Sequence, residues 1–236
     1  MKALAVVLAV SLLIPIAMPA LALSDQELNS DWAQLSRYAE ANSDLKPLAD
    51  GQSRVVFFGD SITDAFPIAK LFPEKPYINR GISGQTTPQM LVRFRPDVVD
   101  LHPSVVVILA GTNDLAQNTG IETLQQIEGN FKSMCELAKS NKIDVVLCSV
   151  LPAKDYYWKP GIYPSEKIKE LNDFLRVYAP ANGYGYVDYY SAVVDRDGGL
   201  RADLAKDSVH PNEAGYQTMA PLVESVIQAR LGPDLR

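Results

Sequence analysis

Residues 104–114 read SVVVILAGTND, in which five large aliphatic side chains are followed by a short turn that ends in polar residues. A run with no polar alternation is typical of a parallel strand that is covered by helices on both faces of its sheet. Four further runs rich in apolar and β-branched residues predict four more strands. The predicted strands cover residues 55–58, 77–79, 105–110, 144–150 and 186–188. Helical patterns separate them, and this alternation predicts an α/β fold, a three-layer α/β/α sandwich with a five-stranded parallel sheet.

The predicted helices follow from apolar residues at a spacing of three and four positions. They cover residues 87–101, 121–140 and 165–178, and a last helix follows Asn212. A further amphipathic helix is predicted at the N-terminal side, starting from a capping box formed by Ser24 and Glu27. Its apolar positions are Leu28, Trp32, Leu35 and Ala39. The sequence has no internal repeat and no Ser/Gly-rich linker, so it predicts one domain after the N-terminal segment.

The first 22 residues have the pattern of a secretory signal peptide. Lys2 precedes an uncharged apolar run that ends in Ala20-Leu21-Ala22, a small-x-small sequence that signal peptidase accepts. The alternative is an uncleaved membrane anchor, since the apolar run is long enough to span a bilayer. Two prolines interrupt such a helix, which favours removal. We therefore expect a signal peptide at 1–22, a single domain at 23–236, export to the periplasm or the medium, and no stable membrane insertion after cleavage.

The composition argues against several classes of function. Lys and Arg number 22 against 28 Asp and Glu, a formal net charge of −6, so a basic surface for nucleic acid is not expected. The two cysteines are too few for a disulfide scaffold or a zinc ribbon. Cys135 and Cys148 could pair in an oxidising compartment, but two buried free thiols are the favoured interpretation. Only His102 and His210 can supply an imidazole to a reaction.

Glycine-led turns follow three of the predicted strands. In an open parallel sheet, ligands bind outside the carboxyl ends of the strands, so the polar residues of these turns are candidates for a site. The turns read GDSIT at 59–63, GISGQT at 81–86 and GTND at 111–114. The first lifts the Ser61 hydroxyl to the start of a helix, where it is either a nucleophile or simply the helix N-cap. Gly84 could offer its backbone N–H, and Asn113 its side-chain amide, to a developing negative charge, although both are also common turn residues.

A histidine with a nearby carboxylate stands close to the C-terminus. Residues 207–211 read DSVHP, so Asp207 lies three residues before His210. A carboxylate on the same turn of chain can accept a hydrogen bond from Nδ1 of the imidazole, which leaves Nε2 free to take a proton from Ser61. His102 competes for this role, but it precedes the predicted strand at 105–110 and so belongs to the amino end of the sheet.

Taken together, GDSIT, GISGQT, GTND and DSVHP resemble the four sequence blocks of the SGNH subgroup of the GDSL-type serine esterases, within the GDSL-like lipase/acylhydrolase family. GDSIT has Ile where the family's name has Leu, a conservative change. The resemblance implies a flavodoxin-like α/β/α fold and hydrolysis of acyl esters or thioesters with no metal and no cofactor. It also implies Ser61 as the nucleophile, His210 as the base, Asp207 as its partner, and an oxyanion hole made by the backbone amides of Ser61 and Gly84 and the side chain of Asn113.

An aromatic-rich loop follows the fourth predicted strand. Residues 152–164 read PAKDYYWKPGIYP, and a loop at a carboxyl end lies near the mouth of the predicted site. Its candidate substrate-binding side chains are Tyr156, Tyr157, Trp158 and Tyr163. They can stack on sugar rings or line an acyl groove, or they can simply pack against one another. We expect an esterase for short-chain or acetyl esters of small molecules or carbohydrate. A lysophospholipase or acyl-thioesterase is one alternative, and a catalytically inactive sugar-binding module is another.

Overall fold

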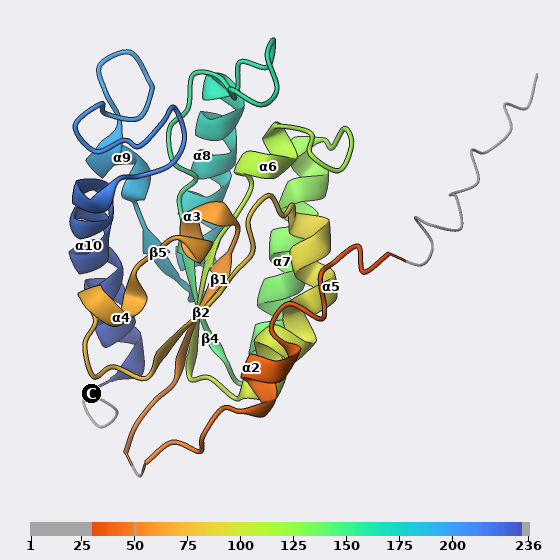
Figure 1. The fold of residues 1–236 in the computed structure, drawn as a ribbon, viewed down its shortest axis with the longest axis vertical. Helices are drawn as coiled ribbons and strands as arrows, with labels where there is room; N and C mark the ends of the chain where they lie inside the picture. The colour runs from red at the N-terminus through yellow and green to blue at the C-terminus, as the bar shows by residue number, and fades with distance from the viewer. Residues whose placement is uncertain (1–29, 50, 233–236) are drawn as a thin grey trace, which may run out of the picture. The chain divides into compact units, whose positions relative to one another are not determined.

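A five-stranded parallel sheet lies at the centre of the part of the protein that the structure describes (Figure 1). The computed structural model describes residues 30–49 and 51–232, and from Asp31 onwards the chain forms one compact unit. The strands are β1 (Val55–Gly59), β2 (Tyr77–Gly81), β3 (Val105–Leu109), β4 (Asp144–Cys148) and β5 (Gly185–Val187). Their order is β2-β1-β3-β4-β5, and each neighbouring pair is parallel. The predicted α/β fold class and the five predicted strands are confirmed.

The strands are buried on both faces. Every residue of β1 and β3 is buried, because alternate side chains enter two separate apolar clusters, one on each side of the sheet. Val56 and Ile108 belong to one cluster, while Val55 and Val107 belong to the other. Since neither face of these strands meets water, their sequences carry no polar alternation.

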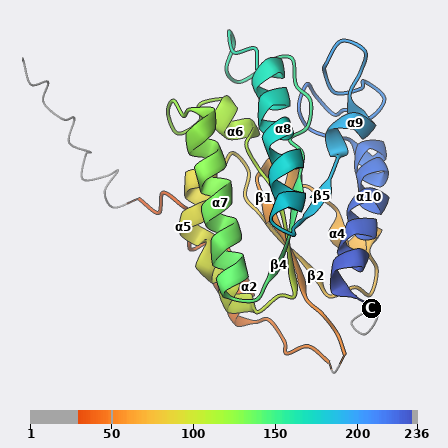
Figure 2. The same ribbon diagram turned by 180° about the vertical axis from the view of Figure 1, so that it is seen from behind.

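Helices cover both faces of the sheet, as two opposite views show (Figure 1 and Figure 2). One face is covered by α5 (Thr87–Asp97), α7 (Leu124–Ser140) and α8 (Ser165–Ala181). The other is covered by α4 (Ile68–Leu71), α9 (Tyr189–Val193) and α10 (Glu213–Leu231). The remaining short elements are α2 (Ala39–Ser43), α3 (Ser61–Asp64), α6 (Thr112–Leu115) and the 3₁₀ turn η1 (Val99–Leu101). Within the described residues, no helix combines the length and the apolar character needed to cross a bilayer.

The predicted N-terminal amphipathic helix is wrong where it can be checked. Its capping box and first apolar position lie outside the described residues, as does the predicted signal peptide. Residues 31–38 run through turns, and a helix begins only with α2. The Asp31 carboxylate accepts hydrogen bonds from two backbone N–H groups that follow it, and Gln34 has a left-handed backbone with φ of 55°. Because these features interrupt a helix, the expected apolar face does not form, and Trp32 is 48% exposed.

Three other predicted helices have different bounds, and the one predicted at 165–178 extends to Ala181 as α8. The helix at 87–101 divides into α5 and η1, since Pro96 has no N–H to donate within the helix and Val98 leaves the helical region with φ of −131°. The helix at 121–140 begins later, because Thr123 and Gln126 form a capping box that sets its first turn.

Both cysteines are buried free thiols. Cys135 lies in α7 and Cys148 in β4, so they occupy different layers of the fold. Burial raises the pKa of the Cys135 thiol to about 12, so its reactive thiolate is scarce at neutral pH. The favoured interpretation of the cysteines is confirmed, and they pack as small apolar side chains.

The carboxyl ends of β1, β2 and β3 lie side by side, because the registers align Gly59 with Gly81 and with Leu109. The three glycine-led turns leave from this edge, and α3 and α6 begin there (Figure 1). A Cβ atom at Gly59 would lie 2.2 Å from Oγ1 of Thr63 and 2.5 Å from the carbonyl oxygen of Leu109. Only glycine allows this close approach, which explains the first residue of GDSIT.

Candidate active site

The turn after β1 presents the Ser61 hydroxyl at the carboxyl edge of the sheet. Asp60 caps α3, since its Oδ1 accepts a hydrogen bond from the Ile62 N–H at 2.9 Å. The serine hydroxyl is therefore not used as a helix cap, which is the alternative that the sequence leaves open. Instead, Oγ of Ser61 lies 2.8 Å from Nε2 of His210.

His210 is held by the carboxylate three residues before it. Its Nδ1 lies 2.9 Å from Oδ2 and 3.0 Å from Oδ1 of Asp207. Oδ1 of Asp207 also accepts the backbone N–H groups of Val209 (2.9 Å) and His210 (2.8 Å), so the carboxylate closes the turn that carries the imidazole. When Nδ1–H is donated to Asp207, the lone pair of Nε2 faces Ser61. This is the arrangement of a general base beside a nucleophile.

The charge of Asp207 suits the position of an orienting carboxylate. Partial burial acts to raise its pKa, but the backbone N–H groups of His210 and Val209 and the imidazole together outweigh burial. The net effect lowers the pKa of Asp207 from its ordinary value. The carboxylate is thus ionised at neutral pH, where it can stabilise an imidazolium on His210.

Gly84 and Asn113 line the same pocket as Ser61 and His210. Gly84 has φ of +80°, in the left-handed region that glycine adopts without strain. Asn113, in α6, is 3% exposed, and its Nδ2 donates one hydrogen bond to the carbonyl oxygen of Gln85 at 3.0 Å. The amide carries a second N–H, which can serve a ligand in the pocket.

The pocket holds about 340 Å³. Its lining consists of Ser61, Ser83, Gly84, Asn113, Asn118, Tyr157, Trp158 and His210. Ser83 and Asn118 are not among the residues that the sequence patterns indicate. Ser83 falls inside GISGQT, so its place in a strand-end loop is a usable signal. Asn118 lies beyond the GTND motif, in a segment with no pattern of its own.

The four aromatic candidates of the loop after β4 fall into two groups. Tyr157 and Trp158 line the pocket. Tyr156 is fully buried, and its hydroxyl accepts a hydrogen bond from Thr112 at 3.1 Å. Tyr163 is 80% exposed and lies outside the pocket lining. The substrate-binding prediction is therefore corrected for Tyr156, which fills the core under the loop, whereas the role of the solvent-exposed Tyr163 stays a prediction.

A buried arginine connects the loops of the site. Arg93 of α5 donates hydrogen bonds to the carbonyl oxygens of Gly59 and Arg80, both at 2.9 Å, and to Asp97 at 3.0 Å. Its Nε donates to the side chain of Gln85, in the GISGQT loop. One guanidinium therefore fixes the ends of β1 and β2 relative to that loop. An Arg–Asp pair four residues apart on a helix usually indicates an exposed ion pair, so the sequence carries no signal for this role.

Two buried carboxyl groups adjoin the site in sequence. Burial raises the pKa of Asp60 to about 7, against the opposing effect of its hydrogen bond from Ile62. Burial also raises the pKa of Asp114 to about 6, although Thr87 donates both its hydroxyl and its N–H to that carboxyl group. Both groups bind a proton more tightly than an exposed carboxyl does. Among the described residues, no three His, Cys, Asp or Glu side chains come together as a metal site would require.

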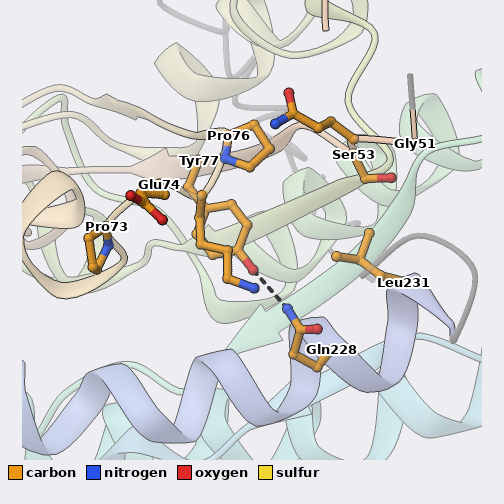
Figure 3. Close-up of a pocket in the computed structure, with 10 residues that line it drawn as sticks. Gly51, Ser53, Pro73, Glu74, Pro76, Tyr77, Gln228 and Leu231 are labelled. Carbon is orange, nitrogen blue, oxygen red and sulfur yellow. Dashed lines mark hydrogen bonds between the residues drawn. The ribbon is translucent and has the colours of Figure 1, made fainter. Parts of the chain in front are cut away.

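A second hollow lies at the amino end of the sheet (Figure 3). It holds about 300 Å³, and Tyr77, the first residue of β2, forms part of its wall. The Tyr77 hydroxyl accepts a hydrogen bond from Gln228 at 3.1 Å and donates one to Glu224 at 3.0 Å. Among the described residues that line it there is a serine, Ser53, but neither histidine of the chain. This hollow therefore lacks the serine–histidine pair that the first pocket contains.

The family model of the GDSL-like lipase/acylhydrolase family matches residues 57–218, a range that includes all four motifs. The chain belongs to this family, and the resemblance drawn from the motifs is confirmed. Among solved structures, a proposed acylhydrolase from Bacteroides fragilis is 44% identical, with a TM-score of 0.83. That match covers 86% of this chain and 99% of the other.

Two curated proteins are more distant relatives. An acetylxylan esterase from Xylanibacter ruminicola is 27% identical over 214 residues, which cover 74% of this chain and 43% of that protein. The uncharacterized lipoprotein YqeF from Bacillus subtilis is 25% identical over 146 residues, which cover 54% of this chain and 60% of that protein. The chain thus spans less than two thirds of the length of either relative.

Proposed function

We propose that the protein is a serine ester hydrolase that cleaves short-chain acyl esters through an acyl-enzyme. The observation that carries this proposal is the 2.8 Å contact between Oγ of Ser61 and Nε2 of His210, with Asp207 on the other nitrogen of the ring. A hydroxyl alone is a weak nucleophile at neutral pH, and an oriented imidazole supplies the base that it needs.

The first half of the reaction transfers the acyl group to Ser61. Oγ attacks the carbonyl carbon of the ester while Nε2 of His210 takes the hydroxyl proton. The negative charge that forms on the carbonyl oxygen is stabilised by the backbone N–H groups of Ser61 and Gly84 and by Nδ2 of Asn113. The carbon–oxygen bond to the alcohol then breaks, and His210 returns its proton to the departing oxygen.

The second half of the reaction releases the acid. His210 takes a proton from a water molecule, and the resulting hydroxide attacks the acyl carbon under the same oxyanion stabilisation. The bond to Oγ breaks, Ser61 regains its proton from His210, and a free carboxylic acid leaves. The imidazole must be neutral in both attacks, since only then can Nε2 accept a proton.

The pocket lining supports a small acyl group. Among the described residues that form it, Tyr157 and Trp158 are the only large apolar side chains, and the lining contains no Leu, Ile, Val or Met that would follow a long chain. Tyr157 is 62% exposed, so its ring is accessible for stacking on a sugar of the alcohol portion. The relationship to an acetylxylan esterase agrees with this substrate class. We therefore propose acetyl esters, with acetylated carbohydrate as the preferred kind.

Export is a separate part of the proposal. The sequence of residues 1–22 supports a cleaved signal peptide, with one hydrolase domain at 23–236 that acts in the periplasm or outside the cell. A lipoprotein among the relatives agrees with an exported location. Mass spectrometry of the protein secreted by its host tests this part, since cleavage after Ala22 would leave Leu23 as the first residue.

Chain-length preference tests the substrate class. Purified protein is compared on 4-nitrophenyl acetate and 4-nitrophenyl dodecanoate, with Ser61→Ala as the control. We expect a higher kcat/KM for the acetyl ester and no hydrolysis by the variant. A clear preference for the dodecanoyl ester would contradict the short-chain proposal and favour a lysophospholipase or a thioesterase. Sugar binding without hydrolysis of either ester would favour an inactive binding module.

A further inference from the structure

Three side chains of the pocket form a continuous series of hydrogen bonds that the proton transfers do not use. Nε1 of Trp158 donates to Oδ1 of Asn118 at 2.9 Å. Nδ2 of Asn118 donates to Oδ1 of Asn113 at 2.9 Å and to the carbonyl oxygen of Gly84 at 3.2 Å. Nδ2 of Asn113 in turn donates to the carbonyl oxygen of Gln85. The series thus runs from the aromatic loop to the side chain of Asn113 and the backbone of Gly84, two residues of the proposed oxyanion hole.

The direction of this series is set by its first donor. An indole N–H can only donate, so the atom of Asn118 that faces Trp158 must be its carbonyl oxygen. The amide nitrogen of Asn118 then faces Asn113, where it must meet an oxygen. Asn113 consequently turns its nitrogen toward Gln85 and the pocket. A flipped Asn113 amide would present an oxygen there, which would repel an oxyanion.

The backbone also brings Asn118 to this contact. After α6, Gln117 adopts a left-handed conformation with φ of 59°, which is uncommon for a residue that has a Cβ atom. The turn places the Asn118 N–H on the carbonyl oxygen of Asn113 at 3.0 Å. The two asparagines are therefore joined through the backbone and through their side chains.

We propose that Asn118 is a positioning residue which, with Trp158 as the terminal donor, holds the carboxamide of Asn113 in the orientation that stabilises an oxyanion. This inference rests on the proposed function, because an oxyanion forms only if Ser61 attacks an ester. Asn118 acts through Asn113, and Trp158 acts through its N–H in addition to lining the pocket with its ring. The aromatic loop thereby influences the chemical step as well as substrate binding.

Two uncharged variants break the series at different links. Trp158→Phe keeps an aromatic ring and removes the N–H, whereas Asn118→Leu keeps a similar shape and removes both donor and acceptor. We expect kcat on 4-nitrophenyl acetate to fall about tenfold in Asn118→Leu and less in Trp158→Phe, below the 10²–10³-fold typical of losing an oxyanion donor outright. KM should change less than kcat. Trp32→Phe and Asn182→Leu are the matched controls outside the pocket, and both should keep the wild-type kcat.

A double-mutant cycle with Asn113→Ala decides the question. If Asn118 acts through Asn113, Asn118→Leu costs about tenfold in kcat in the wild-type background but less than about twofold when residue 113 is alanine. Equal fold losses in the two backgrounds would overturn the inference, since they would indicate an effect that does not pass through Asn113. A loss of kcat accompanied by a lost thermal transition in both single variants would overturn it as well.

The two proposals fail in different ways. Wild-type protein with no activity on any acyl ester would contradict the proposed function and, with it, the positioning role of Asn118. Active wild-type protein, inactive Ser61→Ala and equal losses in the cycle would contradict the positioning role alone.

Discussion

Two hollows of similar size lie at opposite ends of one sheet and differ in the chemistry of the side chains that line them. The amino-end hollow (Figure 3) holds about 300 Å³ and the carboxyl-end pocket about 340 Å³. The first combines Ser53 with tyrosine, glutamate and lysine side chains, whereas the second brings Ser61 within 2.8 Å of His210. The parallel topology collects the glycine-led turns at one edge of the sheet. Topology, more than the size of a cavity, therefore locates the candidate chemistry.

The largest expected difference between the two hollows is their response to losing a serine. Ser61→Ala should lower kcat on 4-nitrophenyl acetate by about 10⁴-fold or more, because the proposed nucleophile is removed. Ser53→Ala makes the same change in the amino-end hollow and should leave kcat unchanged. Steady-state kinetics of the two variants checks this, and an active Ser61→Ala protein would contradict the assignment of Ser61 as the nucleophile.

Removing a cation should have a large effect on stability only at the carboxyl end. Arg93→Met leaves the buried Asp97 carboxylate without its ion-pair partner, and we expect the free energy of unfolding to fall by about 3 kcal/mol or more. Lys75→Met, in the amino-end hollow, removes a more exposed cation that lies 3.7 Å from Glu224. This variant should change the free energy of unfolding by less than about 1 kcal/mol. Urea denaturation measures both values. Equal changes would show that Arg93 does not connect the loops as described.

Loss of a carboxamide should likewise distinguish the two ends. Asn113→Ala should lower kcat about 10²–10³-fold, since one donor to the oxyanion is lost, while weak activity persists. Gln228→Ala removes a carboxamide from the amino-end hollow and should leave kcat at the wild-type level. If Asn113→Ala keeps full activity on the ester that the wild type prefers, Asn113 is not an oxyanion donor.

The smallest expected effect is a pH dependence of stability at the carboxyl end. Burial raises the pKa of Asp60 to about 7 from the ordinary value of 3.8, so the folded chain binds this proton more tightly than the unfolded chain. The associated stability is present at low pH and is lost as the pH rises from about 4 to about 7. Relative to Asp60→Asn, the wild type should lose at least about 1 kcal/mol of unfolding free energy across that range. Parallel pH curves from urea denaturation would contradict the raised pKa.

Most of the fold could be predicted because the composition of each strand depends directly on whether its two faces are buried. The run at 105–109 is buried on both faces of the sheet, and it therefore contains only apolar residues. The N-terminal helix could not be predicted in this way, because Asp31 and Gln34 override a helical spacing with local hydrogen bonds and a left-handed backbone.

In the candidate site, some residues are marked by local sequence patterns and others are not. Ser61, Gly84 and Asn113 stand in glycine-led turns after strands, and His210 has its carboxylate on the same turn of chain, so strand-end and spacing rules find them. Arg93 and Asn118 each have contacts with residues far away in sequence, such as Gly59 for Arg93 and Trp158 for Asn118, and no local pattern marks them. The same limit explains the aromatic loop, because its sequence does not show that Tyr156 turns into the core.

Covalent labelling of the purified protein tests the central claim most directly. A fluorophosphonate probe forms a bond to a serine oxygen only where a base removes the hydroxyl proton and an oxyanion hole receives the phosphoryl oxygen. We predict one label per chain, mapped by peptide mass spectrometry to Ser61, with labelling lost in Ser61→Ala and strongly slowed in His210→Gln. An unlabelled wild-type protein, or a label on Ser53 at the other end of the sheet, would contradict the account.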